Sequence, residues 1–198
     1  LRPEGAAGEE GFETKSSEAE QAKSLIAARA VAEFVRAGDV IALEGGTTVA
    51  AMVPFLPKER ISVVTNSLPV AVRLRQERAG LPVTMPGGWV SAVSGNLCGP
   101  DAVKRLALIE SSACFISATG FDAKRGPMDP NPLEIEAKRA LAERARRVVL
   151  LMEGSKWKRT STCVTLHPRR IHVVVTNAPP PPAAAAVLRA HGVRVMRV

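Results

Sequence analysis

The chain has few of the residues that mark secreted, metal-binding or nucleic-acid-reading proteins. Its 198 residues include three cysteines and three histidines, and aromatic residues make up only 4%. Cys98, Cys114 and Cys163 lie far apart, with neither a CxxC pair nor a Cys/His spacing suited to zinc. The sequence therefore predicts no disulfide framework, no metal site and no cofactor, and it favours a reduced, cytoplasmic setting.

Long apolar runs and targeting signals are also missing. No stretch approaches the roughly 20 apolar residues that cross a bilayer, and the first residues lack the pattern of a secretory signal. A membrane is therefore not an expected partner. With 46% hydrophobic residues the chain can bury one sizeable core, and we expect a single globular domain.

Positive charge is in excess, with a net charge of +8 and a pI near 10.0. Such values suit a nucleic-acid partner, but the basic residues are scattered through segments such as 139–147. The sequence shows no zinc finger, no helix-turn-helix and no aromatic platform for bases. We therefore expect a solvated basic surface, whose charge assists a DNA-binding part outside this chain, and not a groove that reads sequence.

Strand-like and helix-like segments alternate along most of the chain. Residues 1–16 are rich in Gly, Glu and Ala and are predicted to be a linker remnant or tail, whereas 17–198 form the domain. A capping pattern at Ser17 predicts a first helix that Gly38 closes. Alternation of this kind favours an α/β fold with a doubly wound, largely parallel sheet. The expected strands are 40–43, 61–64, 82–86, 113–118, 148–152, 171–176 and 193–198, and the expected helices include 47–55, 67–75, 101–109 and 133–146, with a loop at 126–132.

A polar turn follows the first predicted strand. It reads Glu44-Gly45-Gly46-Thr47-Thr48 and joins the strand to a helix. Two glycines allow a sharp turn, and the helix start offers backbone N–H groups and two hydroxyls. This pattern suits an anionic or polyhydroxylated small molecule, although an ordinary turn with Thr47 as helix cap explains it equally well.

Similar clusters follow later strands, and in a parallel sheet they would meet at one edge, where ligands bind. They are Thr65-Asn66-Ser67, Gly87-Gly88, Thr119-Gly120-Phe121-Asp122 and Gly154-Ser155-Lys156. Together they predict one polar pocket. Each also has a structural explanation as turn or cap residues.

Four charged residues are candidates for ligand contact in this pocket. Lys156 is the first choice, because a loop lysine after a buried strand can bind a phosphate. Asp122 and Glu134 can accept hydrogen bonds from hydroxyls, and Lys138 lies one helical turn from Glu134. The alternatives are a surface lysine at 156 and a surface ion pair between Glu134 and Lys138.

Seven motifs in order give the chain a resemblance to the C-terminal effector-sensing domain of DeoR-type bacterial transcriptional regulators. They are Glu44-Gly45-Gly46-Thr47-Thr48, 64–69, Pro86-Gly87-Gly88, 95–100, 118–122, 134–139 and Gly154-Ser155-Lys156. The resemblance covers residues 20–198. Three departures stand out: Glu44 in place of the usual Asp, Glu153-Gly154 before Ser155, and Thr176-Asn177 in a late strand.

The resemblance carries expectations for fold, ligand and partners. It implies the ribose-5-phosphate isomerase/CoA transferase-like fold and a phosphorylated sugar or similar metabolite as effector. It also implies a homo-oligomer that contacts DNA only through an N-terminal winged helix-turn-helix, which this sequence does not contain. A non-enzymatic sensor is thus the leading hypothesis. The alternatives are a sugar-phosphate isomerase-like enzyme, for which Glu44, Asp122 and Lys156 supply suitable groups, and a CoA transferase.

Overall fold

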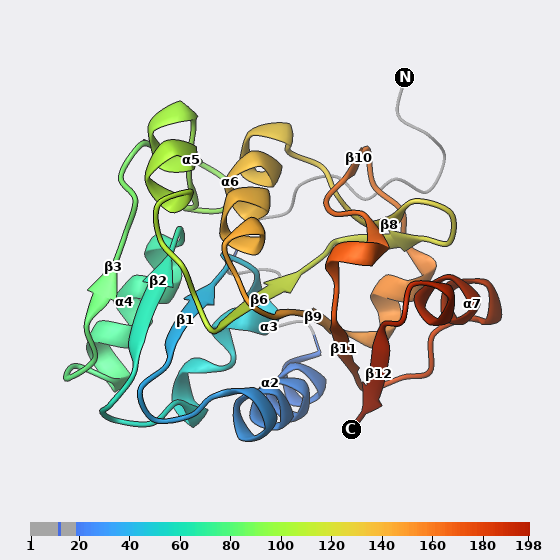
Figure 1. Ribbon diagram of the computed structural model, residues 1–198, viewed down its shortest axis with the longest axis horizontal. Helices are drawn as coiled ribbons and strands as arrows, with labels where there is room; N and C mark the ends of the chain where they lie inside the picture. The colour runs from blue at the N-terminus through green and yellow to red at the C-terminus, as the bar shows by residue number, and fades with distance from the viewer. Residues whose placement is uncertain (1–11, 13–18) are drawn as a thin grey trace.

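A parallel sheet of seven strands forms the centre of the protein. The computed structural model describes Phe12 and residues 19–198 (Figure 1). The prediction of a tail, apart from Phe12, and the prediction of a cap at Ser17 fall outside the described residues. The strand order is β12-β11-β9-β6-β1-β2-β3, and every neighbouring pair is parallel. The strands are β1 Val40–Leu43, β2 Ser62–Thr65, β3 Val83–Thr84, β6 Ala113–Ser117, β9 Val148–Met152, β11 Val173–Thr176 and β12 Arg194–Arg197.

Each central strand buries side chains on both faces of the sheet. In β9, Val149 and Leu151 belong to one apolar cluster, and Val148, Leu150 and Met152 to the other. Successive side chains of a strand point to opposite faces, so a strand covered on both sides must be apolar throughout. This explains why the strands appear as continuous hydrophobic runs in the sequence, and it confirms the doubly wound arrangement.

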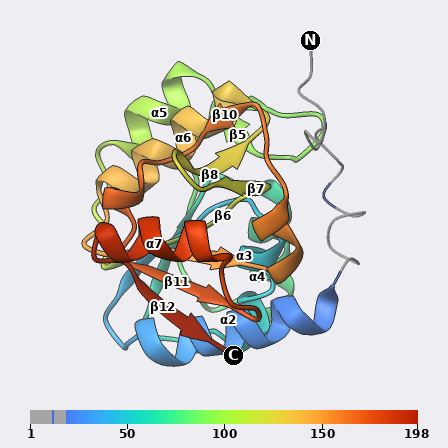
Figure 2. The ribbon, with the colours of Figure 1, turned by 90° about the vertical axis from the view of Figure 1, so that its right-hand side faces the viewer.

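Helices cover both faces of the sheet (Figure 2). On one face lie α2 (Glu20–Phe34), α3 (Thr47–Ala50), the short 3-10 helix η1 (Val53–Phe55) and α4 (Leu68–Glu77). On the other lie α5 (Pro100–Leu106), α6 (Pro132–Glu143) and α7 (Pro182–Ala190). Ser67 and Asn131 cap α4 and α6 by accepting backbone N–H groups. The fold thus places the start of each of these two helices beside the sheet.

Two small antiparallel sheets were not predicted from the sequence. One joins β7 (Gly120–Asp122), β8 (Gly126–Asp129) and β10 (Cys163–Val164), and the other is the β4–β5 hairpin, with strands Trp89–Val90 and Leu97–Cys98. The predicted loop 126–132 is therefore wrong in its first half, which is β8. Partners on both sides satisfy the backbone groups of β8, and these partners are distant in sequence.

Four predicted helices end earlier than expected, and those predicted at 101–109 and 133–146 end at Leu106 and Glu143. Residues 47–55 form α3 and then η1, in which Pro54 lacks the N–H that would continue an α-helix. The first helix ends at Phe34, and Gly38 lies in the following turn with a φ of +91°. Two further 3-10 helices, η2 (Gly154–Lys158) and η3 (Pro168–Arg170), follow β9 and precede β11.

Candidate functional site

The strand order changes direction between β1 and β6. From β1 the chain extends the sheet outward through β2 and β3, and it then returns to the other side of β1 with β6. Doubly wound sheets bind ligands at the carboxyl ends of their strands beside such a switch. A cavity of about 80 Å³ lies at this position. It is lined by Glu44, Gly45, Gly46, Ser94, Asn96, Ser117, Ala118, Thr119, Asp129, Pro130, Asn131, Glu134, Ile135 and Lys138.

Lys138 connects three elements at the base of this cavity. Its Nζ lies 2.6 Å from Asp129 Oδ2, 3.0 Å from Glu44 Oε1 and 2.9 Å from the carbonyl oxygen of Ser117. An ammonium group has three hydrogens to donate, and these three acceptors use them all. Lys138 therefore holds α6 against the ends of β1, β6 and β8, with no donor left for a ligand.

Two carboxylates share this single ammonium. Burial raises the pKa of Glu44, and the nearby charge of Lys138 offsets only part of this effect. Burial alone would lower the pKa of Lys138, but the charges of Asp129 and Glu44 outweigh it and raise that pKa. Lys138 thus stays charged at neutral pH. Glu44 also accepts hydrogen bonds at Oε2 from the backbone N–H groups of Gly46 and Ser117, at 3.2 and 3.1 Å.

Glu134 connects the rim of the cavity to the β4–β5 hairpin. Its carboxylate accepts hydrogen bonds from Ser94 Oγ at 2.7 Å, from Asn96 Nδ2 at 2.8 Å and from Asn131 Nδ2 at 3.1 Å. Ser94 and Asn96 belong to the turn of the hairpin, whereas Asn131 and Glu134 begin α6. The rim is thus formed by two segments that hold each other in place through one carboxylate.

Asn96 presents an unpaired acceptor at the cavity. The residue is 3% exposed, and its Oδ1 has no hydrogen-bond partner within the described part of the chain. A Cβ on Gly45 would lie 1.7 Å from this oxygen, and one on Gly46 would lie 1.8 Å from Ser117 Oγ. Only glycine permits such close approach. A buried, unpaired acceptor beside carboxylates favours a ligand that donates hydrogen bonds.

Six of the residues predicted from the sequence meet in the cavity. They are Glu44, Gly45, Gly46, Thr119, Glu134 and Lys138. Lys138 is buried and pairs with Glu44 and Asp129, so the alternative of a surface ion pair with Glu134 is wrong.

The other predicted residues lie outside this lining. Thr47 borders a neighbouring hollow beside Lys23 and Arg73, and Thr48 is buried in α3. The cluster after β2 makes hydrogen bonds that hold the fold: Thr65 Oγ1 accepts from the N–H of Ser67, and Asn66 Nδ2 donates to the carbonyl of Leu97.

The remaining four lie at turns of the same sheet edge or of the small sheet. Gly87 and Gly88 have φ values of +73° and +101° after β3. Asp122 accepts hydrogen bonds from the backbone N–H groups of Lys124 and Arg125. Burial of Asp122 acts to raise its pKa, but these hydrogen bonds outweigh it and lower that pKa. Lys156 belongs to η2, which Glu153 caps through the N–H of Ser155.

The departures at 153–154 and 177 are related in the structure. Asn177 Oδ1 accepts the N–H of Gly154 at 2.8 Å, and a Cβ on Gly154 would lie 2.7 Å from that of Ala178. The asparagine and the glycine therefore fit one another, and they position the turn that carries Lys156.

Sequence reasoning missed several residues of the site. Asp129 is the most important, because it binds Lys138 and also accepts from Thr119 Oγ1 and Thr165 Oγ1, at 3.0 and 2.8 Å. The sequence pattern places it in a loop. Ser94, Asn96, Ser117 and Asn131 were missed as well. Asn96 stands inside one of the seven motifs, and this position was the signal that could have identified it.

Neither a metal cluster nor a membrane-spanning helix occurs in the described residues. Within Phe12 and 19–198, no group of three or more His, Cys, Asp or Glu residues is arranged to hold a metal ion. Over the same residues, no helix has the length and apolar character to cross a membrane.

Curated relatives of this chain are named as regulators of transcription. The chain is 32% identical over 130 residues to the HTH-type transcriptional regulator YulB of Bacillus subtilis, covering 66% of this chain and 50% of that protein. It is 30% identical over 151 residues to the HTH-type transcriptional regulator GolR of Listeria innocua, covering 76% of this chain and 59% of that protein. The chain thus spans about half to three-fifths of the length of these relatives. Their names agree with the expectation of a sensor and not an enzyme.

Solved structures support the predicted fold. Ribose 5-phosphate isomerase A of Methanocaldococcus jannaschii matches with a TM-score of 0.50 at 18% identity, over 69% of this chain and 54% of that one. The probable sor operon regulator of Shigella flexneri matches with a TM-score of 0.52 at 11% identity, over 87% of this chain and 91% of that one. At these identities the likeness concerns the fold alone.

The family model described as the DeoR C-terminal sensor domain matches residues 18–178. This range includes the whole cavity, from Glu44 after β1 to Lys138 on α6, and most of the sheet that positions it. The resemblance drawn from the seven motifs is confirmed, and the chain belongs to the family of DeoR C-terminal sensor domains.

Proposed function

We propose that this chain is the metabolite-sensing part of a transcriptional regulator and that its effector is a phosphorylated sugar or a similar polyol phosphate. The observation that carries the proposal is the cavity at the strand-order switch, where Glu44, Asp129 and Glu134 surround the ends of β1 and β6. Carboxylate oxygens accept hydrogen bonds from hydroxyl groups. The polyol portion of the effector would bind there.

The phosphate of such an effector would lie away from the carboxylates of this cavity. The lining has three carboxylates and one ammonium, and Lys138 already uses its three hydrogens. A dianion placed there would face net negative charge. We therefore propose that the phosphate lies over the turn Gly45–Thr48, with Lys156 as the cation supplied by the turn after β9.

Effector binding would act on DNA indirectly. A ligand changes the balance between two conformations only if it binds one of them more tightly. The Glu134 contacts to Ser94 and Asn96 link the cavity to the β4–β5 hairpin, and hydroxyls that compete for Glu134 would alter this link. A DNA-binding module outside this chain would respond to the change. We propose that the regulator is cytoplasmic.

We also propose that the protein is a homo-oligomer. Large apolar side chains are exposed on α4 and on the hairpin, among them Val72 at 54% and Trp89 at 59%. A second copy of the chain is the simplest cover for such side chains. Light scattering after size-exclusion chromatography measures the mass in solution, and a monomer at all concentrations would contradict this part of the proposal.

A thermal-shift screen tests the proposed effector class. Sugar phosphates and polyol phosphates are compared with their dephosphorylated counterparts, since a ligand that binds only the folded state raises the melting temperature. We expect the phosphorylated member of one pair to give the larger shift. No shift from any phosphorylated compound at millimolar concentration would contradict the effector class.

Two lysine variants test the position of the phosphate. Lys156→Ala should weaken binding of the best compound at least tenfold, about 1.4 kcal/mol, in titration calorimetry. Lys158→Ala, an exposed neighbour in the same 3-10 helix, is the matched control and should leave affinity unchanged. Equal affinities of both variants and the wild type would remove Lys156 from the site.

The same compound distinguishes sensing from catalysis. Incubated with the protein and followed by NMR, it should remain unchanged. Conversion at rates above roughly 1 s⁻¹, the low end of ordinary turnover, would instead establish the isomerase-like alternative.

A further inference from the structure

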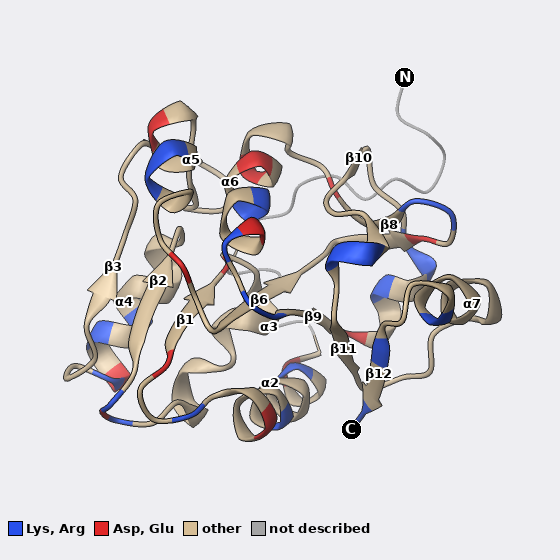
Figure 3. Cartoon of the chain, in the orientation of Figure 1, with Lys and Arg blue, Asp and Glu red and all other residues tan. Residues whose placement is uncertain are grey.

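The edge of the sheet opposite the cavity is strongly basic. It consists of the segments that precede β1, β2, β6, β9, β11 and β12, at residues 35–39, 57–61, 107–112, 144–147, 167–172 and 190–193, together with Arg194, the first residue of β12. We call these segments the basic edge. Its acidic residues are Asp39, Glu59 and Glu110, and its basic residues are Arg36, Lys58, Arg60, Arg144, Arg146, Arg147, Arg169, Arg170 and Arg194. Figure 3 shows basic residues along these segments.

Backbone hydrogen bonds join these segments into one continuous edge. The N–H of Gly38 donates to Arg60, the N–H of Ser111 donates to Arg144, and the N–H of Arg194 donates to His172. Five spacings of about 4.8 Å separate the six strands, so the edge is roughly 24 Å long. The positive charges thus form a row whose length compares with that of a short stretch of duplex DNA.

Several arginines of the edge are held by neutral groups. The guanidinium carbons of Arg147 and Arg194 lie 5.5 and 5.7 Å from the ring centre of Phe34, at the end of α2. Arg36 donates to carbonyl oxygens of the last turn of the same helix. These contacts order the side chains without neutralising their charge.

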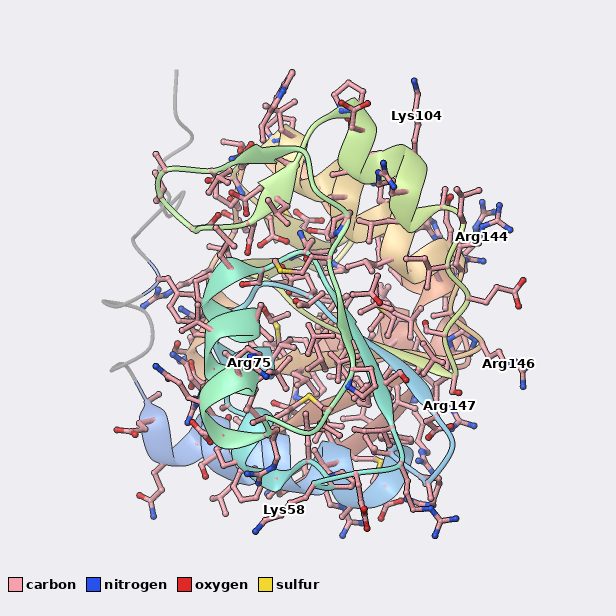
Figure 4. The ribbon with its side chains drawn as sticks, turned by 90° about the vertical axis from the view of Figure 1, so that its left-hand side faces the viewer. Lys58, Arg75, Lys104, Arg144, Arg146 and Arg147 are labelled. Atoms are coloured by element: carbon pink, nitrogen blue, oxygen red, sulfur yellow. The ribbon has the colours of Figure 1, made fainter. Side chains whose placement is uncertain are left out.

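The carboxylates of the described residues do little to offset this charge. Among residues 19–198, the ion pairs of Arg29, Arg73, Arg125 and Lys138 lie outside the basic edge, and no basic residue of the edge is in an ion pair. Burial lowers the pKa of His172, and the nearby charges of Arg147 and Arg170 lower it further. In Figure 4, Arg144, Arg146 and Arg147 lie along the same side of the molecule, and all three are exposed.

We propose that the basic edge is a second binding surface, which contacts the phosphate backbone of duplex DNA without reading its sequence. The choice of DNA rests on the proposed role in transcription control. Guanidinium groups match phosphate geometry, and duplex DNA carries one negative charge per roughly 1.7 Å of its axis. Because the edge and the cavity lie at opposite ends of the strands, DNA and effector can bind at the same time.

Fluorescence anisotropy with a labelled 30-base-pair duplex of arbitrary sequence tests the proposal. The 198-residue chain is titrated between 25 and 200 mM KCl, and we expect weak binding that falls steeply as salt increases. In the edge variant, Arg144→Gln, Arg146→Gln and Arg170→Gln are combined. In the control variant, Arg75→Gln, Lys124→Gln and Lys158→Gln remove the same charge from exposed positions elsewhere.

The edge variant should bind at least tenfold more weakly than the wild type at 25 mM KCl. The slope of log K against log salt is negative, and it should become less steep by about 0.9 for each phosphate that the protein no longer neutralises. The control variant should stay within about threefold of the wild type. Thermal melting of each variant verifies its fold. If the edge variant is unfolded, the single variant Arg146→Glu replaces it, and this variant should also bind DNA more weakly than the wild type.

Three results would overturn the proposal. One is no binding of the wild type at 25 mM KCl, and another is an equal loss of affinity in the edge and control variants, which would indicate net charge alone. The third is displacement of the duplex by poly-glutamate at lower charge concentration than by unlabelled DNA, which would assign the edge to an acidic protein. Each of them leaves effector binding, measured separately, unaffected.

Discussion

The ammonium of Lys138 on α6 lies 3.0 Å from the carboxylate of Glu44 at the end of β1, and both side chains are buried. This pair, with Asp129 at 2.6 Å, connects a helix on one face of the sheet to the central strand. A buried charge pair stabilises a fold only when both partners are present, because either charge alone is costly to bury.

Replacing the lysine should therefore destabilise the domain strongly. Lys138→Met leaves the buried carboxylate of Glu44 and the partly buried carboxylate of Asp129 without a counter-charge, and we expect a loss of about 3–5 kcal/mol in urea unfolding. Adding Glu44→Gln should restore part of that loss, since one unpaired charge is removed. Lys104→Met, at an exposed position of α5, should change stability by less than about 0.5 kcal/mol. A Lys138→Met protein as stable as the wild type would show that the pair does not hold α6 in place.

Glu44 should make stability depend on pH in a specific direction. Its pKa is raised in the folded protein above 4.5, so the folded state binds a proton more tightly than the unfolded state. The contribution of Glu44 to stability is then greatest below the unfolded pKa and decreases as pH rises through the folded pKa. Lowering the pH from 7 to 5 should thus favour the wild type relative to Glu44→Gln. Urea unfolding at both pH values measures this, and identical pH profiles of the two proteins would contradict it.

A side chain at position 45 should disturb the cavity. In Gly45→Ala the new Cβ would lie 1.7 Å from Asn96 Oδ1, so Asn96 must move and its hydrogen bond to Glu134 must lengthen. We expect a destabilisation of about 1–3 kcal/mol and weaker effector binding. Gly80→Ala is the control, because its Cβ would meet only the carbonyl of Lys58 at 3.5 Å. Equal melting temperatures of the two variants would argue against close packing at Gly45.

Glu134 should hold the β4–β5 hairpin closed. Glu134→Gln places an amide donor opposite the donors of Ser94, Asn96 and Asn131, and at least one of these hydrogen bonds must break. Amide hydrogen exchange in residues 89–98 should become faster, by about tenfold for each 1.4 kcal/mol lost. Glu136→Gln, exposed on the same helix, should leave exchange unchanged. If both variants exchange alike, the carboxylate does not restrain the hairpin.

The sequence predicted the central fold well because its signals are local. Each buried strand is a short apolar run, and glycine, proline or capping residues separate the runs from helices. The direction of the sheet and the position of Glu44, Gly45 and Gly46 at its carboxyl edge follow from this alternation. Local signals also placed Glu134 and Lys138 on one helix.

The contacts of the site could not be predicted in the same way. Lys138 meets Asp129 only because β8 pairs with β7 and β10, and strands of two to four residues leave little pattern in a sequence. The i,i+4 spacing of Glu134 and Lys138 suggested a surface pair, whereas the two side chains bind different partners. Burial of Lys138 is a property of the assembled layers, which spacing along a helix does not report.

The saturated ammonium of Lys138 separates two tasks within one cavity. The groups at its base are committed to one another and cannot be exchanged without endangering the fold. Ser94, Asn96, Asn131 and Glu134 at the rim come from a hairpin turn and a helix start, and their hydrogen bonds join them to one another and not to Lys138. Selection for a new metabolite could therefore act on the rim alone. Such a division lets one scaffold diversify in specificity while the contacts that hold α6 to the sheet are kept.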